Sequence, residues 1–387
     1  MERRRSKGEE SGSGEAERGG AEAETAERGP EGRSSLFKRA VQATLFTVRA
    51  ASDGVSSARK VPLKRRIQTF WLLTWLVGLF LLPLLVLPLC AFLIFATPLS
   101  PLVIGYITWL GFIDKSARTG TRKRVLSGAF IWNHIRDYFP MALVKTADIE
   151  PNRSYVFGYH PHGVISMGAV INFATFATGF DKKFPGVNVH LLTLASNFYI
   201  PLCREWILGM GLCDASKETC HNILKKGKGE SIMLAVGGAE ESLDSHPGSY
   251  KLTLKERKGF VRVALKAGAS LVPVMSFGET ELWSALPNPD GSRIRYFQQE
   301  MKKLLKFTVP FFHGRGVFNY NFGLMPFRRP IHSVVGEPIY IDAPYDISTD
   351  EGRDKVDEVH ALYIARLKEL FEKHKKDYGI SSSLVIK

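Results

Sequence analysis

Hydrophobic and polar positions divide the chain into three regions. Residues 1–34 contain no aromatic residue and few apolar ones, whereas the stretch from Ile67 to Phe112 contains no charged residue. Beyond about residue 120, short apolar runs alternate with stretches whose apolar positions recur at helical spacing. These patterns predict a disordered tail, a membrane segment at 67–113 and a folded domain at 120–387.

The uncharged stretch is long enough to cross a bilayer twice, because about 20 apolar residues suffice for one crossing. Basic residues flank both of its ends, at Lys64–Arg66 and at Lys115 and Arg118. By the positive-inside rule, both ends lie on the cytosolic side. A transmembrane helical hairpin is therefore expected, and one span followed by an interfacial helix is the alternative. Four prolines mark the expected turn of the hairpin: Pro83, Pro88, Pro98 and Pro101.

The segment 35–66 mixes apolar residues with lysine and arginine. This pattern fits a basic amphipathic helix that lies on a membrane surface. An ordinary packed surface helix would show the same pattern, so the sequence leaves both interpretations open.

The remaining chain reads as strands that alternate with helices, which indicates an α/β fold with a mostly parallel or mixed sheet flanked by helices. A first helix is expected from about Ser127 to Phe139, where Pro140 stops it. The predicted strands are Tyr155–Tyr159, His190–Leu194, Ser231–Val236, Ser270–Ser276 and Ser333–Val335. Further helices are predicted at Ser216–Lys226, Gly259–Ala267, Arg293–Leu305 and Ser348–Lys375.

The formal net charge of +14 indicates an anionic partner, which could be nucleic acid, a phosphate-rich ligand or a membrane surface. No nucleic-acid-binding motif is recognisable and the membrane segment competes with that interpretation, so no nucleic acid is expected. The four cysteines form no CxxC pair, which fits reduced thiols that face the cytosol.

The stretch FGYHPHGVIS at 157–166 follows a predicted strand with two histidines between glycines. Such a position, at the carboxyl edge of a sheet, is where α/β folds place ligands. A neutral imidazole there could act as a general base. A metal site would need a third ligand that the neighbouring sequence does not supply. A structural pair of histidines in a turn remains the other alternative.

Two further stretches carry candidate chemistry. In LAVGGAEESLDSHPG, at 234–248, Gly237 and Gly238 allow close backbone approach, and the carboxylate of Glu240 or Glu241 could orient an imidazole or a hydroxyl. A solvated loop with ordinary acidic residues would show the same pattern. In the next stretch, Arg257 and Lys258 precede a helix whose free N–H groups could bind phosphate. Arg204 and Arg315 are set among apolar and glycine neighbours and are further candidates for binding an anionic ligand.

These stretches together resemble the type 2 diacylglycerol acyltransferase family, which also includes monoacylglycerol and wax-alcohol acyltransferases. The resemblance covers about Ile131 to Lys375. It implies an acyl-CoA-dependent enzyme that makes triacylglycerol from diacylglycerol, in the endoplasmic reticulum membrane and on lipid droplets, with both termini cytosolic. It rests on YHPHG at 159–163, VGGAEESLDSHPG at 236–248, RKGFVRVAL at 257–265, FHGRG at 312–316 and VVGEPI at 334–339.

The resemblance also assigns site residues. His162 is expected to be the catalytic base, with His160 beside it and Glu241 as the acidic partner. The wider glycerolipid acyltransferases use an HxxxxD pair, but here Met167 stands where the aspartate would follow His162, and Ile165 where it would follow His160. The residues expected to bind substrate are Tyr159, Pro161, Gly163, Arg204, Gly237, Gly238, Arg257, Lys258 and Arg315.

No cofactor and no metal are expected, since acyl-CoA is a co-substrate. The sequence does not separate diacylglycerol from monoacylglycerol or a long-chain alcohol as acceptor. It also leaves open a non-catalytic lipid-binding protein on the same fold, an acyl-thioester on Cys203, Cys213 or Cys220, and whether the chain forms a homo-oligomer.

Overall fold

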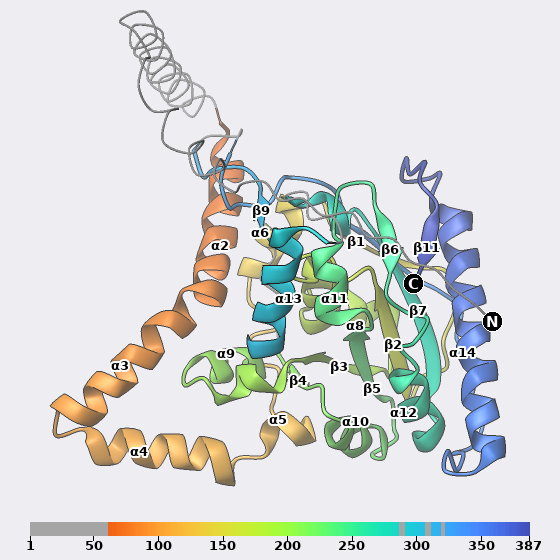
Figure 1. The fold of residues 1–387 in the computed structure, drawn as a ribbon, viewed down its shortest axis with the longest axis horizontal. Coiled ribbons are helices and arrows are strands. Elements are labelled where there is room, and N and C mark those ends of the chain that lie inside the picture. The colour runs from red at the N-terminus through yellow and green to blue at the C-terminus, as the bar shows by residue number, and fades with distance from the viewer. Residues whose placement is uncertain (1–60, 286–290, 306–310, 319–321) are drawn as a thin grey trace, which may run out of the picture. The chain divides into compact units, whose positions relative to one another are not determined.

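The computed structural model describes residues 61–285, 291–305, 311–318 and 322–387. The predicted tail at 1–34 and nearly all of the predicted amphipathic segment at 35–66 lie outside the described residues. Residues from Lys60 to Lys387 form one compact unit (Figure 1).

A seven-stranded sheet forms the centre of this unit, in the order β1-β10-β7-β2-β5-β3-β4. All neighbouring strands pair in parallel except β10 and β7, which are antiparallel. The mixed sheet confirms the predicted fold class. The strands are β1 (Ala142–Lys145), β2 (Tyr155–His160), β3 (Asn188–Thr193), β4 (Cys213–Asp214), β5 (Glu230–Ala235), β7 (Ser270–Phe277) and β10 (His332–Val335).

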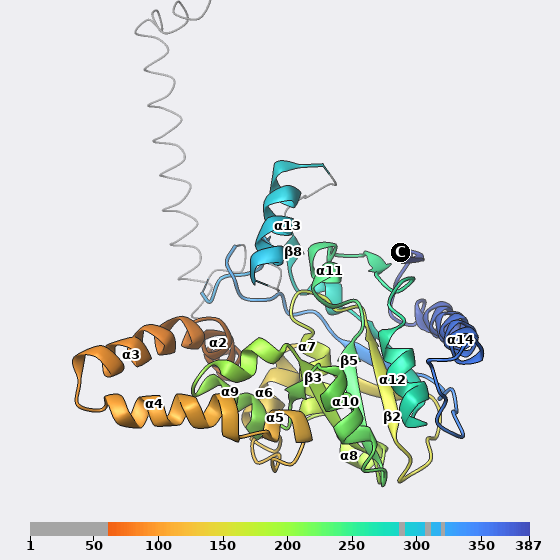
Figure 2. The ribbon, with the colours of Figure 1, turned by 60° about the horizontal axis from the view of Figure 1, so that its bottom comes forward.

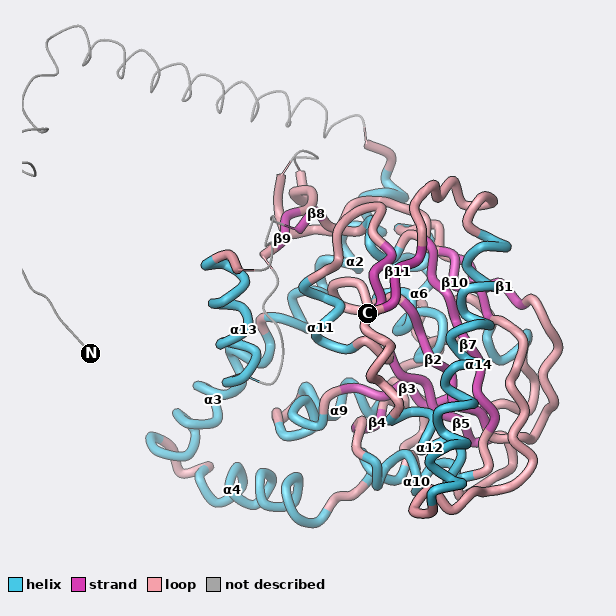
Figure 3. Tube along the Cα trace, turned by 45° about the vertical axis from the view of Figure 1, so that its right-hand side comes forward, coloured by secondary structure: helices cyan, strands magenta, loops and turns pink. Residues whose placement is uncertain are grey.

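Helices cover both faces of the sheet (Figures 1 and 3). Side chains alternate along β2, so that Tyr155, Phe157 and Tyr159 join one hydrophobic core while Val156 joins the other. The first core includes residues of α2 (Leu63–Phe80), α6 (Ile131–Tyr138), the π-helix η2 (Val170–Ala174) and α8 (Phe180–Lys183). The second core includes residues of α10 (Lys217–Leu224), α12 (Gly259–Ala267) and α14 (Asp350–His374).

The five predicted strands and four of the predicted helices are present with small shifts of their ends, and α12 and α13 (Arg293–Leu305) have the predicted bounds. The helix predicted from Ser127 begins only at Ile131. The pattern did not predict the shorter elements, which contain too few residues to show a period. These are α5 (Ser116–Thr119), α7 (Met167–Ala169), η2, α8, α9 (Cys203–Gly209), α11 (Gly238–Leu243), the 3₁₀ turns η3 (Ala195–Tyr199) and η4 (Glu279–Glu281), the strand pairs β6 (Tyr250–Leu252) with β11 (Leu384–Ile386) and β8 (Ser284–Ala285) with β9 (Phe312–His313), and the edge strands β1 and β4.

The uncharged stretch forms α2 (Leu63–Phe80), α3 (Leu82–Ala96), α4 (Ser100–Thr108) and the π-helix η1 (Trp109–Ile113). Among the described helices, none alone is long and apolar enough to cross a membrane. Only α2 and α3 together meet that requirement, with a bend of 48° between them. The chain reverses between α3 and α4, which lie next to each other (Figure 2). Part of α2 packs on the domain, where Leu72, Trp75 and Leu76 are buried.

Candidate active site

Two of the sequence motifs and one further residue meet at one edge of the sheet. The segment HPHG begins at the last residue of β2, the glycine pair at 237–238 follows β5, and Glu279 follows β7. Since β2 pairs in parallel with both β5 and β7, the carboxyl ends of these strands are neighbours. In open α/β sheets this edge is the usual place for a ligand site.

His162 presents a basic nitrogen at this edge. Its Nδ1 lies 3.1 Å from the carbonyl oxygen of Gly163, and a carbonyl can only accept a hydrogen bond. Nδ1 therefore carries the proton, and Nε2 keeps its lone pair. Burial lowers the pKa of His162 below its usual value, which keeps the ring neutral at neutral pH. The side chain is only partly buried, so it is the histidine of the pair that a substrate can reach.

His160 points to the opposite side of the strand and is fully buried. Its Nε2 lies 3.0 Å from the hydroxyl of Tyr363 on α14, and that hydroxyl donates to the carbonyl of Gly158 at 3.2 Å. Because the tyrosine has a single proton, His160 must donate from Nε2. Burial lowers the pKa of His160 to about 3, so this ring stays neutral. His160 is thus a positioning residue that joins β2 to α14.

Glu241 on α11 contacts the main chain of His162. Its carboxylate accepts from the His162 N–H and from the Thr253 N–H, each at 2.8 Å. The sequence predicts that Glu241 orients the imidazole, but this prediction is wrong, because the Gly163 carbonyl accepts from the ring instead. Burial raises the pKa of Glu241 to about 7, and Arg257 is close enough to oppose this shift. Gly237 makes room for the carboxylate, since a Cβ there would lie 1.9 Å from the Glu241 Cδ.

Glu279 is a site residue that the sequence did not single out. It is buried at the start of η4 and accepts from the Tyr159 hydroxyl at 2.7 Å. It also accepts from the N–H groups of Met167 at 2.7 Å and Gly168 at 2.9 Å. Burial raises its pKa to about 7. The only signal in the sequence was a carboxylate directly after the strand and a glycine, a position shared with many solvated loops.

The predicted substrate-binding residues of the histidine turn are part of its support. Tyr159, Pro161 and Gly163 are all buried. A Cβ at Gly163 would lie 2.7 Å from the Glu279 Cγ, and φ at Gly163 is +62°. At the second motif, Gly238 has a φ of +58°, which favours glycine. These residues fix the backbone around His162 rather than offering side chains to a ligand.

The buried arginines have partners within the chain. Arg204 on α9 pairs with Asp114 at 2.5 Å and with Glu205 at 3.0 Å. Arg315 donates to the hydroxyls of Tyr138 at 2.6 Å and Thr69 at 3.0 Å, so it connects the domain to α2. These contacts account for the burial of both guanidinium groups without a ligand.

The two cations before α12 differ from each other. Arg257 is exposed, whereas Lys258 pairs with Asp357 on α14 at 2.8 Å. Because Arg257 also acts on Glu241, it lies on the side of the molecule that carries the histidine turn. It is the better placed of the two for an anionic group that approaches the site.

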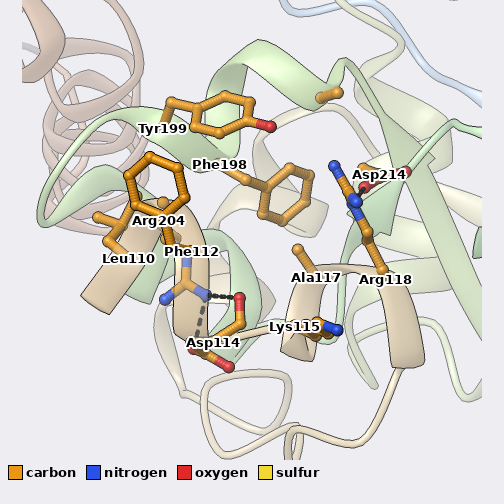
Figure 4. A pocket seen from close by; sticks show the side chains of 12 residues that line it. Leu110, Phe112, Asp114, Lys115, Ala117, Arg118, Phe198, Tyr199, Arg204 and Asp214 are labelled. Atoms are coloured by element: carbon orange, nitrogen blue, oxygen red, sulfur yellow. Dashed lines mark hydrogen bonds and ion pairs between the residues drawn. The ribbon is translucent and has the colours of Figure 1, made fainter. Parts of the chain in front are cut away.

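An open pocket lies where η1 meets η3, α9 and β4 (Figure 4). Its wall combines aromatic side chains with charged ones. Figure 4 shows Arg204 directed to Asp114 and Arg118 directed to Asp214. Both arginines therefore pair with carboxylates. The pocket has both apolar and charged side chains in its wall and lies at the end of the uncharged stretch.

The cysteines lie in settings that disfavour a thiolate. Cys203, Cys213 and Cys220 are buried, and burial raises the pKa of Cys213 to about 12 and that of Cys220 to about 11. The Cys213 Sγ lies 3.8 Å from the His190 Nδ1, a contact that crosses between strands and was not visible in the sequence. Since both side chains are almost completely buried, this pair cannot meet a substrate. Within the described ranges, no three His, Cys, Asp or Glu side chains are placed to hold a metal ion.

Comparison with known proteins shows the family to which this chain belongs. The family model for diacylglycerol acyltransferase matches residues 92–387, and the chain belongs to this family. It is 44% identical to diacylglycerol O-acyltransferase 2B of Umbelopsis ramanniana, over 83% of this chain and 91% of that one. It is 45% identical to diacylglycerol O-acyltransferase 2 of Dictyostelium discoideum, over 81% and 93%. It is 43% identical to 2-acylglycerol O-acyltransferase 1 of Bos taurus, over 83% and 95%.

Among solved structures, a 1-acyl-sn-glycerophosphate acyltransferase from Thermotoga maritima aligns with 79% of this chain and 98% of its own. The TM-score of 0.33 and the identity of 14% are too low to support an argument about fold or function.

Proposed function

We propose that this chain transfers a fatty acyl group from acyl-CoA to the free hydroxyl of diacylglycerol, which yields triacylglycerol and CoA. The observation that carries the proposal is the state of His162: a neutral ring, partly exposed at the carboxyl edge of the sheet, with its lone pair on Nε2. Family membership supports the substrate class, since several relatives are named diacylglycerol O-acyltransferases.

In the proposed reaction, Nε2 of His162 takes the proton of the acceptor hydroxyl while that oxygen attacks the thioester carbonyl. The tetrahedral intermediate then collapses, the carbon–sulfur bond breaks, and the thiolate of CoA recovers a proton from the imidazolium. No acyl-enzyme is formed. The Gly163 carbonyl that accepts from Nδ1 also stabilises the transient positive charge of the ring. The exposed guanidinium of Arg257 is our candidate for binding the CoA phosphates.

The stretch from α2 to η1 supports a location on the endoplasmic reticulum membrane and on lipid droplets. Its return arm, α4 with η1, extends from Ser100 to Ile113. At 1.5 Å per residue this arm is about 21 Å long, less than the roughly 30 Å of a bilayer core. We therefore infer that the hairpin enters one leaflet and returns to the cytosolic side. This arrangement also suits an enzyme that meets one substrate in water and the other in lipid.

A monoacylglycerol acceptor is the second candidate, because relatives from Bos taurus and Homo sapiens are named 2-acylglycerol O-acyltransferase 1. Membranes that contain the full chain should be assayed with labelled acyl-CoA against diacylglycerol, monoacylglycerol and a fatty alcohol in parallel. Triacylglycerol as the main product supports our assignment. Faster transfer to monoacylglycerol or to the fatty alcohol would contradict this assignment and identify that compound as the acceptor.

The role of His162 is tested by His162→Ala. Because general-base catalysis contributes roughly 10²–10⁴-fold to rate, we expect acyl transfer to fall by that factor. Membrane association should be unchanged. His134→Ala is a matched control, since that histidine lies on α6, where its ring packs against Phe130, and should keep its activity. Near-normal acyl transfer by His162→Ala would show that His162 is not the catalytic base and that the histidine turn is structural.

A further inference from the structure

The acidic residue that glycerolipid acyltransferases place after the histidine is absent from this sequence at Met167, but a carboxylate from another part of the chain binds the main chain there. The main-chain N–H of Met167 donates to the Glu279 Oε1 at 2.7 Å. The N–H of the next residue, Gly168, donates to the Glu279 Oε2 at 2.9 Å. The carboxylate thus comes from the end of β7 and binds the chain at the position of the missing aspartate.

The turn that carries His162 is held from both sides. At its start, Glu241 accepts from the His162 N–H at 2.8 Å. Within it, the Ser166 N–H and hydroxyl both donate to the His162 carbonyl, at 3.0 and 2.9 Å. At its end, Glu279 accepts from Met167 and Gly168. Two glutamates therefore fix the main chain that presents the imidazole. They lie in the segments that follow β5 and β7, the two strands that flank β2.

The space around Glu279 is fitted to its carboxylate. A Cβ at Gly163 would lie 2.7 Å from the Glu279 Cγ, and a Cβ at Gly168 would lie 2.8 Å from the Glu279 Oε2. The Tyr159 hydroxyl completes the contacts at 2.7 Å and in turn lies 2.7 Å from the Ser276 hydroxyl. The glutamate is therefore in direct contact with the glycine that follows His162.

Every hydrogen-bond partner of Glu279 is a donor. Two main-chain N–H groups and one tyrosine hydroxyl point at its oxygens, and no lysine, arginine or histidine pairs with it in the part of the chain that the structure describes. A carboxylate accepts through both oxygens, whereas a glutamine presents an NH₂ group on one side. That group would face an N–H donor whichever way the amide is turned.

We propose that Glu279 is a positioning residue for catalysis, which holds His162 through the main chain of Met167 and Gly168 in place of the aspartate of the HxxxxD pair. This inference rests on the proposed function, since it assigns a role in the reaction that His162 carries out. It concerns the rate of the chemical step and not the binding of acyl-CoA, because Glu279 is completely enclosed and touches no substrate.

The test is Glu279→Gln in the full-length membrane protein, with kcat and the KM for acyl-CoA measured separately and thermal unfolding followed in detergent. A misplacement of about 1 Å can cost about 100-fold in rate, so we expect kcat to fall roughly 10- to 100-fold with KM within about twofold. The matched control is Glu281→Gln in the same turn. Glu281 accepts from the Gly248 N–H and is only partly buried, so this variant should keep the kcat of the wild type.

A second variant covers the case in which Glu279→Gln does not fold. Glu279→Asp keeps the charge but withdraws it from Met167 and Gly168, so kcat should again fall at constant KM. A wild-type kcat in either folded variant, or a change confined to KM, would overturn the proposal. Failure of both variants to fold would also overturn it, because the role would then be structural. Absence of acyl transfer by the wild type would instead refute the proposed function.

Discussion

At the scale of single residues, hydrogen bonds distinguish the two histidines of the turn after β2. His162 donates from Nδ1 to a carbonyl and keeps a lone pair on Nε2, which a substrate can approach. His160 donates from Nε2 to a tyrosine and is enclosed by the core. Both rings are neutral, but only the first can remove a proton from a substrate.

Gly237 offers a test of the second motif. A Cβ at this position would lie 1.9 Å from the Glu241 Cδ and would displace the carboxylate from the His162 N–H. We expect Gly237→Ala to lower the free energy of unfolding by about 1–3 kcal/mol, as overpacking does, and to slow acyl transfer. Gly259→Ala is the control for stability, because a Cβ there meets no atom within 4 Å. Equal unfolding temperatures for the two variants would contradict this role of Gly237.

The sequence could single out His162 and Glu241 as candidates because each lies in a recognisable motif next to a predicted strand. It could not single out Glu279, whose contacts with the histidine turn depend on the pairing of β7 with β2, two strands far apart in the chain. It also treated Arg204 and Arg315 as ligand-binding residues, since their carboxylate and hydroxyl partners are distant in sequence. A charge among apolar residues indicates burial, but not what satisfies the charge.

At the scale of elements, the strands and long helices followed from their periods, whereas the connections between the hairpin and the domain did not. The return arm, α4 with η1, is tied to α9 by the ion pair between Asp114 and Arg204 and by Tyr106, which donates to Glu205 at 2.8 Å. The start of the hairpin is tied to the domain through Arg315 and Thr69. Both arms are therefore fixed to the domain by polar contacts.

The pair at the end of η1 can be tested by Asp114→Asn. The Arg204 side chain is almost completely buried and would keep only Glu205 as a carboxylate partner. We expect a loss of roughly 1–3 kcal/mol in the free energy of unfolding, because a buried charge is left poorly compensated. Asp342→Asn removes an exposed partner of Arg153 and should leave the unfolding temperature unchanged. If the two variants unfolded at the same temperature, the ion pair between Asp114 and Arg204 would contribute nothing to stability.

At the scale of the whole molecule, the sequon Asn152-Arg153-Ser154 reports the side of the membrane on which the domain lies. Asn152 is exposed, so an oligosaccharyltransferase could reach it in the lumen. With both ends of the hairpin in the cytosol, we expect this asparagine to remain unmodified. The measurement is a mobility shift on treatment with a glycosidase, with an engineered luminal sequon on a fused reporter as the positive control. A shift for the unaltered chain would place the domain in the lumen.

The contact between Tyr363 and the turn after β2 has a consequence for synthesis of the chain. The hairpin between residues 63 and 113 leaves the ribosome well before α14, which supplies the tyrosine that holds His160. Chains are made at roughly 5–20 residues per second, so on the order of 10–50 seconds separate the two events. On the proposed membrane location, the nascent chain is already anchored when its catalytic turn becomes complete. The enzyme would then begin to act only where its lipid acceptor is present.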